Sequence, residues 1–135
     1  MMVEVVNRQR RVKVDPDAWT TFAEQALHAI GNSGSSATIA FVSDRNIRKL
    51  NQRFRGIDKP TDVLSFPADE PDNLGDVAIS VETAAKQSKE NGLSFDDEIA
   101  QLILHGLLHL SGYDHETDNG QMNRLELRLR KKLGI

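Results

Sequence analysis

Hydrophobic positions recur along the chain with two periods, one typical of strands and one typical of helices. Alternating or β-branched apolar runs predict four strands, over residues 2–6, 35–43, 62–66 and 76–81. Apolar positions three or four residues apart predict five helices, over about 16–30, 44–55, 82–90, 95–111 and 118–133. Because helices and strands alternate, the pattern predicts an α/β (α+β sandwich) fold with a small mixed sheet.

Polar residues and glycines mark the predicted helix ends. Asp15 is an N-cap followed by Pro16 at the first helical position, where its missing N–H costs nothing. Ser94 and Asp97 form a pair that resembles a capping box at the start of the fourth helix. Gly112 ends that helix, since glycine adopts the left-handed conformation of a helix C-cap.

The third predicted strand, 62–66, lies between Pro60 and Pro67. Proline cannot donate a hydrogen bond to a sheet ladder, so this strand is expected at an edge of the sheet, antiparallel to its neighbour. The acidic segment after it, ADEPDNLG (68–75), is expected to be a loop.

The last two helices have different faces. Leu, Ile and Ala occupy nearly every side of the helix from 99 to 110, which predicts a buried helix. The final helix is amphipathic, with four apolar residues expected to face the core: Met122, Leu125, Leu129 and Leu133.

Length and composition limit the classes of protein that this chain can represent. We expect one domain over residues 1–135, since 135 residues with 39% hydrophobic content fit a single core. The absence of cysteine excludes disulfides and thiolate metal sites. No apolar run is long enough to span a membrane, and the N-terminus does not resemble a signal peptide. We therefore expect a cytoplasmic protein without a membrane partner.

Charge is distributed unevenly along the chain. The net charge is −3, but the first 59 residues carry +4, residues 60–123 carry −11, and the last twelve carry +4. Such asymmetry indicates a local basic surface, although solvated helix faces would also produce it.

Three of the four histidines lie within HGLLHLSGYDH, residues 105–115. His105 and His109 are four residues apart, so on a helix they share one face about 6 Å apart along the axis. Gly112 lets the chain turn sharply, and His115 can then fold back as a third ligand. Three imidazoles with an open fourth position suit one zinc ion. The alternative is that each histidine is only a packed or surface residue, but a buried apolar helix has little reason to place two such rings on one face.

The spacing of these ligands is that of the metzincin proteases, so the sequence predicts a metzincin-like metal site. In those proteases a general-base glutamate follows the first histidine, whereas this chain has Gly106 there. The same ligand set is therefore expected to perform a different reaction. A phosphodiester is one candidate substrate, since a basic helix offers cations to a phosphate: Arg45, Arg48, Lys49, Arg53 and Arg55, with Lys59 after it. Arg55 stands at the helix exit, where it equally suits balancing the helix dipole.

Together, HGLLHLSGYDH, FRGIDKPTDVLSFP and LGDVAIS resemble the YbeY family of bacterial endoribonucleases, or ribosomal RNA maturation factors, over nearly the whole chain. The resemblance implies a single-strand-specific, metal-dependent endoribonuclease. Its task would be maturation of the 3′ end of small-subunit ribosomal RNA and ribosome quality control. It implies that His105, His109 and His115 bind one Zn²⁺ and that Arg55, beside the metal, is needed for cleavage. Partners would be single-stranded RNA, the small ribosomal subunit and assembly factors, and no DNA.

Several alternatives stay open at this point. The attacking group is either zinc-activated water or the ribose 2′-OH, and no carboxylate is assigned as base. Asp114 and Glu116 flank His115 and either orient a ligand ring or cap a turn. The chain could also be a ribosome-assembly binding factor with structural zinc, or a metzincin-like hydrolase. Structural zinc normally has four protein ligands, and His28, in a different helix, is expected on the surface.

Overall fold

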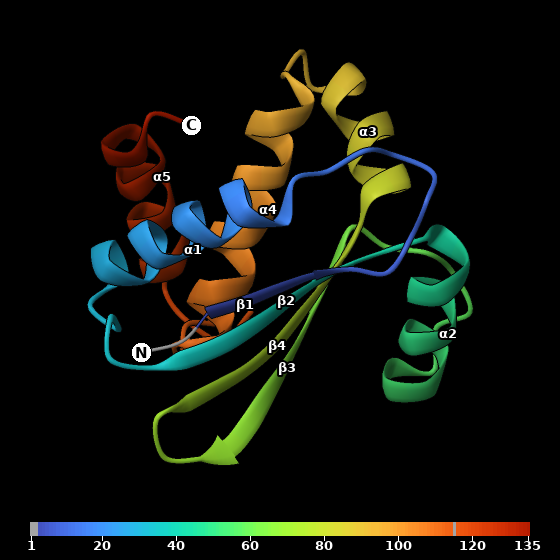
Figure 1. Cartoon of the computed structure of the whole chain (residues 1–135). Helices are drawn as coiled ribbons and strands as arrows, with labels where there is room; N and C mark the ends of the chain where they lie inside the picture. Colours follow the sequence, from blue (N-terminus) through green and yellow to red (C-terminus); the bar gives the residue numbers. More distant parts are fainter. Residues whose placement is uncertain (1–2, 115) are drawn as a thin grey trace.

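The computed structural model describes residues 3–114 and 116–135 and has the predicted α/β architecture in that part of the chain (Figure 1). The elements follow in the order β1 (Val3–Asn7), α1 (Pro16–Ile30), β2 (Ser36–Val42), α2 (Asp44–Arg55), β3 (Val63–Glu70), β4 (Asn73–Ser80), α3 (Val81–Glu90), α4 (Phe95–Leu110) and α5 (Gln121–Leu133). A four-stranded mixed sheet with five helices confirms the predicted fold class.

The sheet has the strand order β1-β2-β4-β3. β1, β2 and β4 are parallel, and β3 pairs antiparallel with β4 at the edge, as the flanking prolines predicted. One row of paired residues crosses the sheet from Val5 through Ile39 and Val77 to Ser65. This row matters for function because Ser65, at its open end, lines the cleft described below.

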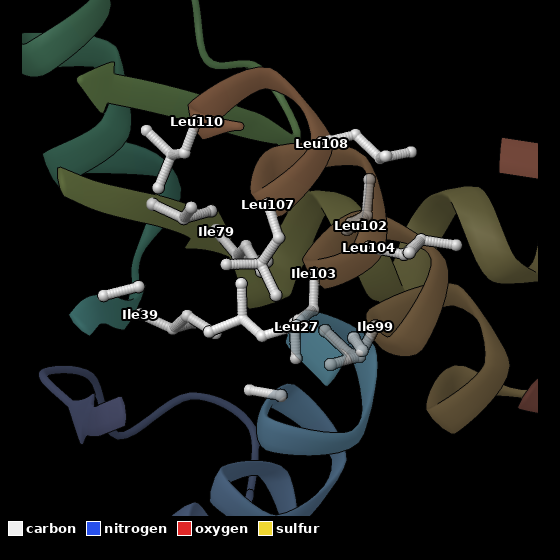
Figure 2. Close-up of a cluster of buried hydrophobic side chains, with 14 of the residues drawn as sticks. Leu27, Ile39, Ile79, Ile99, Leu102, Ile103, Leu104, Leu107, Leu108 and Leu110 are labelled. Carbon is white, nitrogen blue, oxygen red and sulfur yellow. The ribbon is translucent and has the colours of Figure 1, made fainter. Parts of the chain in front are cut away.

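Helices cover both faces of the sheet, unequally. The larger core lies between one face and the helices α1, α3, α4 and α5. Figure 2 shows part of it, with Ile79 of the sheet beside Leu107 and Leu27 of α1 beside Ile103 and Ile99. On the other face α2 stands alone (Figure 1). It closes a smaller core made of Val42, Ile47, Leu64 and Ala78.

Helix α4 is mostly buried beyond its first turn, as predicted for residues 99–110 from their all-round apolar surface. Ile99, Ile103, Leu104, Leu107 and Leu108 have no exposed surface. His105 and His109 are the half-buried positions in its second half.

In the described part of the chain, no helix combines the length and the apolar character needed to cross a membrane.

The predicted helix ends of α1 and α4 are confirmed. The Asp15 carboxylate accepts from two backbone N–H groups of α1, and Ser94 Oγ accepts from the Asp97 N–H at 3.0 Å. Gly112 has φ +100°, and the Tyr113 N–H behind it donates to the Leu108 carbonyl at 3.1 Å. This bond closes the C-terminus of α4 and turns the chain back toward its own last turn.

The expectation that 68–75 is a loop is wrong for most of that segment. β3 continues to Glu70 and β4 begins at Asn73, so only Pro71 and Asp72 form the hairpin turn. Asp72 adopts φ +65°, a conformation that Asp tolerates better than most residues. The acidic side chains on the hairpin are exposed, which lets strand pairing continue through a polar segment.

The last helix begins three residues later than predicted, at Gln121 instead of 118. Asp118 is nonetheless the capping side chain, since its carboxylate accepts from the Gly120 N–H at 2.8 Å and the Met122 N–H at 2.9 Å. Gly120, with φ +89°, separates this cap from the helix. The left-handed glycine therefore delays the first turn of the helix to Gln121.

Candidate active site

His105 and His109 lie side by side on α4, as their spacing predicted. Their ring centroids are 4.7 Å apart and the ring planes meet at 76°. The two rings are the polar side chains in the apolar second half of α4, and both line the same cleft. A helix repeat of 3.6 residues accounts for this, because positions four apart nearly superpose along the axis.

His105 is oriented by a carboxylate from the last helix. His105 Nδ1 and Glu126 Oε1 are 2.7 Å apart, and the other oxygen of Glu126 accepts from Arg130, one turn later in α5. The Glu126 side chain is only 8% exposed. The sequence analysis missed this residue, although a signal existed: Glu126 lies on the inward face of α5 between Met122 and Leu129.

The environment of Glu126 favours its charged form. Burial alone would raise the pKa of this carboxyl. The hydrogen bond with His105 and the positive charge of Arg130 oppose this effect, and the surroundings together hold the pKa below its ordinary value. A carboxylate at this point accepts a hydrogen bond from Nδ1–H, so the nitrogen that His105 can offer to a metal is Nε2.

A cleft of about 530 Å³ joins the histidine pair to Arg55. Arg55 is the last residue of α2, on the opposite face of the sheet from α4. It reaches the cleft at the edge strand β3, whose residues from Val63 to Ser65 form one wall. The structure therefore brings together Arg55, His105 and His109, three of the four predicted site residues.

The fourth predicted residue, His115, lies outside the described residues. The turn around it is described on both sides: Asp114 and Glu116 line the cleft, and the Asp114 carboxylate accepts from the Glu116 N–H at 3.0 Å. Of the two roles weighed for Asp114, capping the turn is therefore observed. The observed orienting carboxylate, the one on His105, is Glu126.

The donor set fits a metal centre only in part within the described residues. Residues 3–114 and 116–135 contain no group of three His, Cys, Asp or Glu side chains arranged to hold a metal ion. They do supply two adjacent imidazoles, one with the carboxylate partner that metal-binding histidines usually have. These two residues fit a zinc ion, provided a third donor comes from the turn after α4.

Gly106 has a structural reason to be glycine. A Cβ at this position would lie 2.7 Å and 3.0 Å from the two methyl carbons of Val77 in β4. Its carbonyl also accepts from Ser65 Oγ at 3.4 Å. Because α4 lies this close to the sheet, the glutamate that a metzincin protease has after its first histidine would not fit here. The contact supports the rejection of the protease interpretation.

The remaining cations and the fourth histidine lie elsewhere. His28 is exposed on α1 and does not line the cleft, as expected. Arg48 forms an exposed, bidentate ion pair with Asp58, at 2.7 Å and 3.1 Å. This pair raises the pKa of Arg48 and lowers that of Asp58 through their mutual hydrogen bonds. Arg55 is thus the α2 cation that lines the cleft with the histidines.

Known proteins are similar to this chain in sequence and in fold. The family model described as Endoribonuclease YbeY matches residues 4–134. Endoribonuclease YbeY of Koribacter versatilis is 43% identical over 131 residues, which cover 97% of this chain and 86% of that protein. The Aquifex aeolicus protein of the same name is 44% identical, over 83% of this chain and 77% of its own length.

A solved structure also agrees. The solution structure of TM1509 from Thermotoga maritima matches with a TM-score of 0.68 and 26% identity, over 98% of this chain and 89% of that one. The family model and the related sequences match nearly the whole chain, and the chain therefore belongs to the Endoribonuclease YbeY family.

Proposed function

We propose that this chain is a zinc-dependent endoribonuclease that cleaves single-stranded RNA. The observation that carries the proposal is the shared cleft of Arg55, His105 and His109. A guanidinium fork matches the oxygens of a phosphodiester, and histidine pairs at this spacing are typical of zinc sites. Membership of a family whose members are named endoribonucleases supports RNA as the substrate.

One Zn²⁺ would be held by His105, His109 and His115. When bound, the ion would supply Lewis-acid polarisation of the phosphodiester and lower the pKa of water. Glu126 would keep the His105 ring in one tautomer and one orientation, since it engages Nδ1. Arg130 would in turn keep Glu126 in place, because it pairs with the second carboxylate oxygen.

Arg55 would hold the scissile phosphate and stabilise the negative charge that builds up during cleavage. It is exposed and ends α2, where the Gly56 N–H closes the helix by donating to the Gln52 carbonyl at 2.9 Å. The helix thus fixes the backbone of Arg55 while its side chain reaches the cleft. A planar, permanently charged group suits this role better than lysine would.

The proposed biological substrate is ribosomal RNA. From the family resemblance we infer a role in maturation of the 3′ end of small-subunit RNA and in ribosome quality control, with the small subunit and assembly factors as partners. A cytoplasmic location is part of this proposal, since ribosomes are its targets. The uneven charge of the chain, with +4 on its first 59 residues, suits a polyanionic partner.

The test separates phosphate binding from metal binding. Arg55→Ala is expected to keep about one zinc per chain and the wild-type circular dichroism spectrum, while cleavage of single-stranded ribosomal RNA falls about 100-fold or more. Arg128→Ala, which removes an exposed arginine of α5 away from the cleft, is the matched control and should cleave normally. Wild-type cleavage by Arg55→Ala would refute the phosphate role.

A second arm tests the zinc itself. His109→Ala is expected to lose both zinc and cleavage. If the folded variant loses zinc and still cleaves RNA at the wild-type rate, the metal is structural and the cleavage chemistry lies around Arg55 instead. Metal content by mass spectrometry and product analysis on the same protein samples decide between the two.

A further inference from the structure

Phe54, in the last turn of α2, exposes 57% of its surface. Among the described residues, the other exposed large hydrophobic side chains are Ile57 at 38% and Leu127 at 53%. A single exposed apolar residue is ordinary in a soluble protein. Phe54 differs from Leu127 because an aromatic ring, that of Phe66, and a guanidinium group, that of Arg53, lie next to it.

The sequence pattern of α2 directs the Phe54 ring toward the sheet, yet the ring lies beyond the core. Ile47, Leu50 and Phe54 follow one stripe of the helix; Ile47 is buried and Leu50 is half-buried. At the end of this stripe, Phe54 meets Phe66 of the edge strand β3, with ring centroids 5.0 Å apart and planes at 61°. The contact holds the ring in place without burying it, so part of the Phe54 ring is exposed to solvent at the edge of the sheet.

This aromatic surface adjoins the cleft. Arg55, the residue after Phe54, lines the cleft with the two described histidines. Pro67, the residue after Phe66, lines it as well. Phe54 and Phe66 do not line the cleft themselves, but each precedes a residue that does, so the aromatic pair lies at the rim of the cleft where α2 meets β3. An RNA strand that extends from a phosphate at Arg55 across this edge of the sheet would pass the pair.

The charge around Phe54 suits a polyanion. Helix α2 contains five Lys or Arg residues against one Asp. The Arg53 guanidinium lies 5.5 Å from the centre of the Phe54 ring. Single-stranded nucleic acids bind where cations follow the backbone and aromatic rings stack on successive bases, whereas an apolar protein partner would not select for this charge.

We propose that Phe54 is a stacking platform for an unpaired base of the RNA whose scissile phosphate is held by Arg55. The inference rests on the proposed function and adds a base subsite to it. It also supplies a physical reason for single-strand specificity. A base in a duplex is already stacked and paired, so it would have to leave the helix to reach the ring, whereas an unpaired base reaches it freely.

The experiment compares two probes and three variants of the full-length zinc-loaded protein. The probes are a fluorescein-labelled single-stranded RNA and the same RNA with abasic residues next to the cleavage site, which keep the phosphates but remove the bases. KM and kcat for cleavage are measured for wild type, Phe54→Ala, Phe54→Trp and Leu127→Ala. Leu127→Ala is the matched control, because it removes an equally exposed apolar side chain from α5.

Phe54→Ala is expected to raise the KM for the unmodified RNA about fivefold to tenfold, because one base loses its stacking partner. The value of kcat should change little. For the abasic RNA, Phe54→Ala and wild type should have the same KM. Phe54→Trp should restore KM, and Leu127→Ala should leave it unchanged. Phe54→Ala should stay folded with only a small loss of thermal stability, since the partly exposed ring gives up one contact, with Phe66.

Two results would overturn the inference. If Phe54→Ala has the wild-type KM for the normal RNA, the ring is not a base platform, and a protein partner becomes the better explanation for its exposure. If it weakens both probes equally, the effect comes from the phosphate backbone and not from stacking. Either result leaves the proposed nuclease standing as long as wild type cleaves RNA and Arg55→Ala does not, so the two proposals fail separately.

Discussion

The Oε1 atom of Glu126 in α5 lies 2.7 Å from the Nδ1 atom of His105 in α4, although the two residues are 21 positions apart in the sequence. The contact joins the last helix to the half-buried face of the central helix. It gives α5 a role beyond covering the core, because a side chain on its buried face determines how a site residue is oriented. The Arg130–Glu126 pair extends the arrangement by one further turn of the same helix.

Replacing Glu126 with Gln is expected to lower zinc affinity about 10- to 100-fold. The amide keeps nearly the same shape, but it loses the negative charge that raises the basicity of the His105 ring. Competition with a zinc chelator measures the change. Glu90→Gln, at an exposed position on α3, removes the same charge without touching the site and should bind zinc normally. Equal zinc affinity in both variants would mean that Glu126 only stabilises the α4–α5 contact.

His105→Ala and His109→Ala are each expected to lose zinc and the stability that zinc adds. A ligand that binds only the folded state stabilises it by about 2.7 kcal/mol at 100 times its dissociation constant. Thermal unfolding with and without EDTA should therefore differ for wild type and coincide for both variants. His28→Ala, on α1 away from the cleft, should behave like wild type. Normal zinc content in both site variants would refute the metal centre.

Much of the fold was predictable because its signals are local. The caps at Asp15 and Ser94 and the left-handed Gly112 depend on neighbouring residues, and the structure has each of them. Glu126 was not predicted, since a carboxylate on an inward helix face gives no indication of the partner it meets across the core. The continuation of β3 to Glu70 was also missed, because pairing with β4 overrides the low strand propensity of an acidic segment.

Gly106→Ala is expected to destabilise the protein by about 1–3 kcal/mol. The added methyl group would meet the side chain of Val77, which lies on a central strand and cannot easily move. Urea unfolding measures the loss. Val77→Ala in the same chain makes room for the new methyl group, so the double variant should lose less than the sum of the two single variants. Strict additivity would show that the contact with Val77 is not the cause.

Gly75→Ala is expected to lower the free energy of unfolding by more than Gly106→Ala does, by about 3 kcal/mol or above. Backbone strain and a steric clash with β3 both contribute. Gly75 has φ +124°, and a Cβ there would lie 2.2 Å from the Phe66 carbonyl oxygen and 2.9 Å from the Pro67 Cα. The β3–β4 hairpin would have to separate at the strand that forms one wall of the cleft.

Gly34→Ala is the control for this change, since a Cβ at Gly34 meets nothing within 4 Å and its φ is not in the left-handed range. Urea unfolding should show wild-type or slightly raised stability for Gly34→Ala and a clear loss for Gly75→Ala. Because Pro67 and Ser65 follow the displaced strand, RNA cleavage by the folded fraction of Gly75→Ala should also fall. Normal stability of Gly75→Ala would mean that the hairpin can open at this point without cost, and the edge strand would then be a movable wall of the cleft.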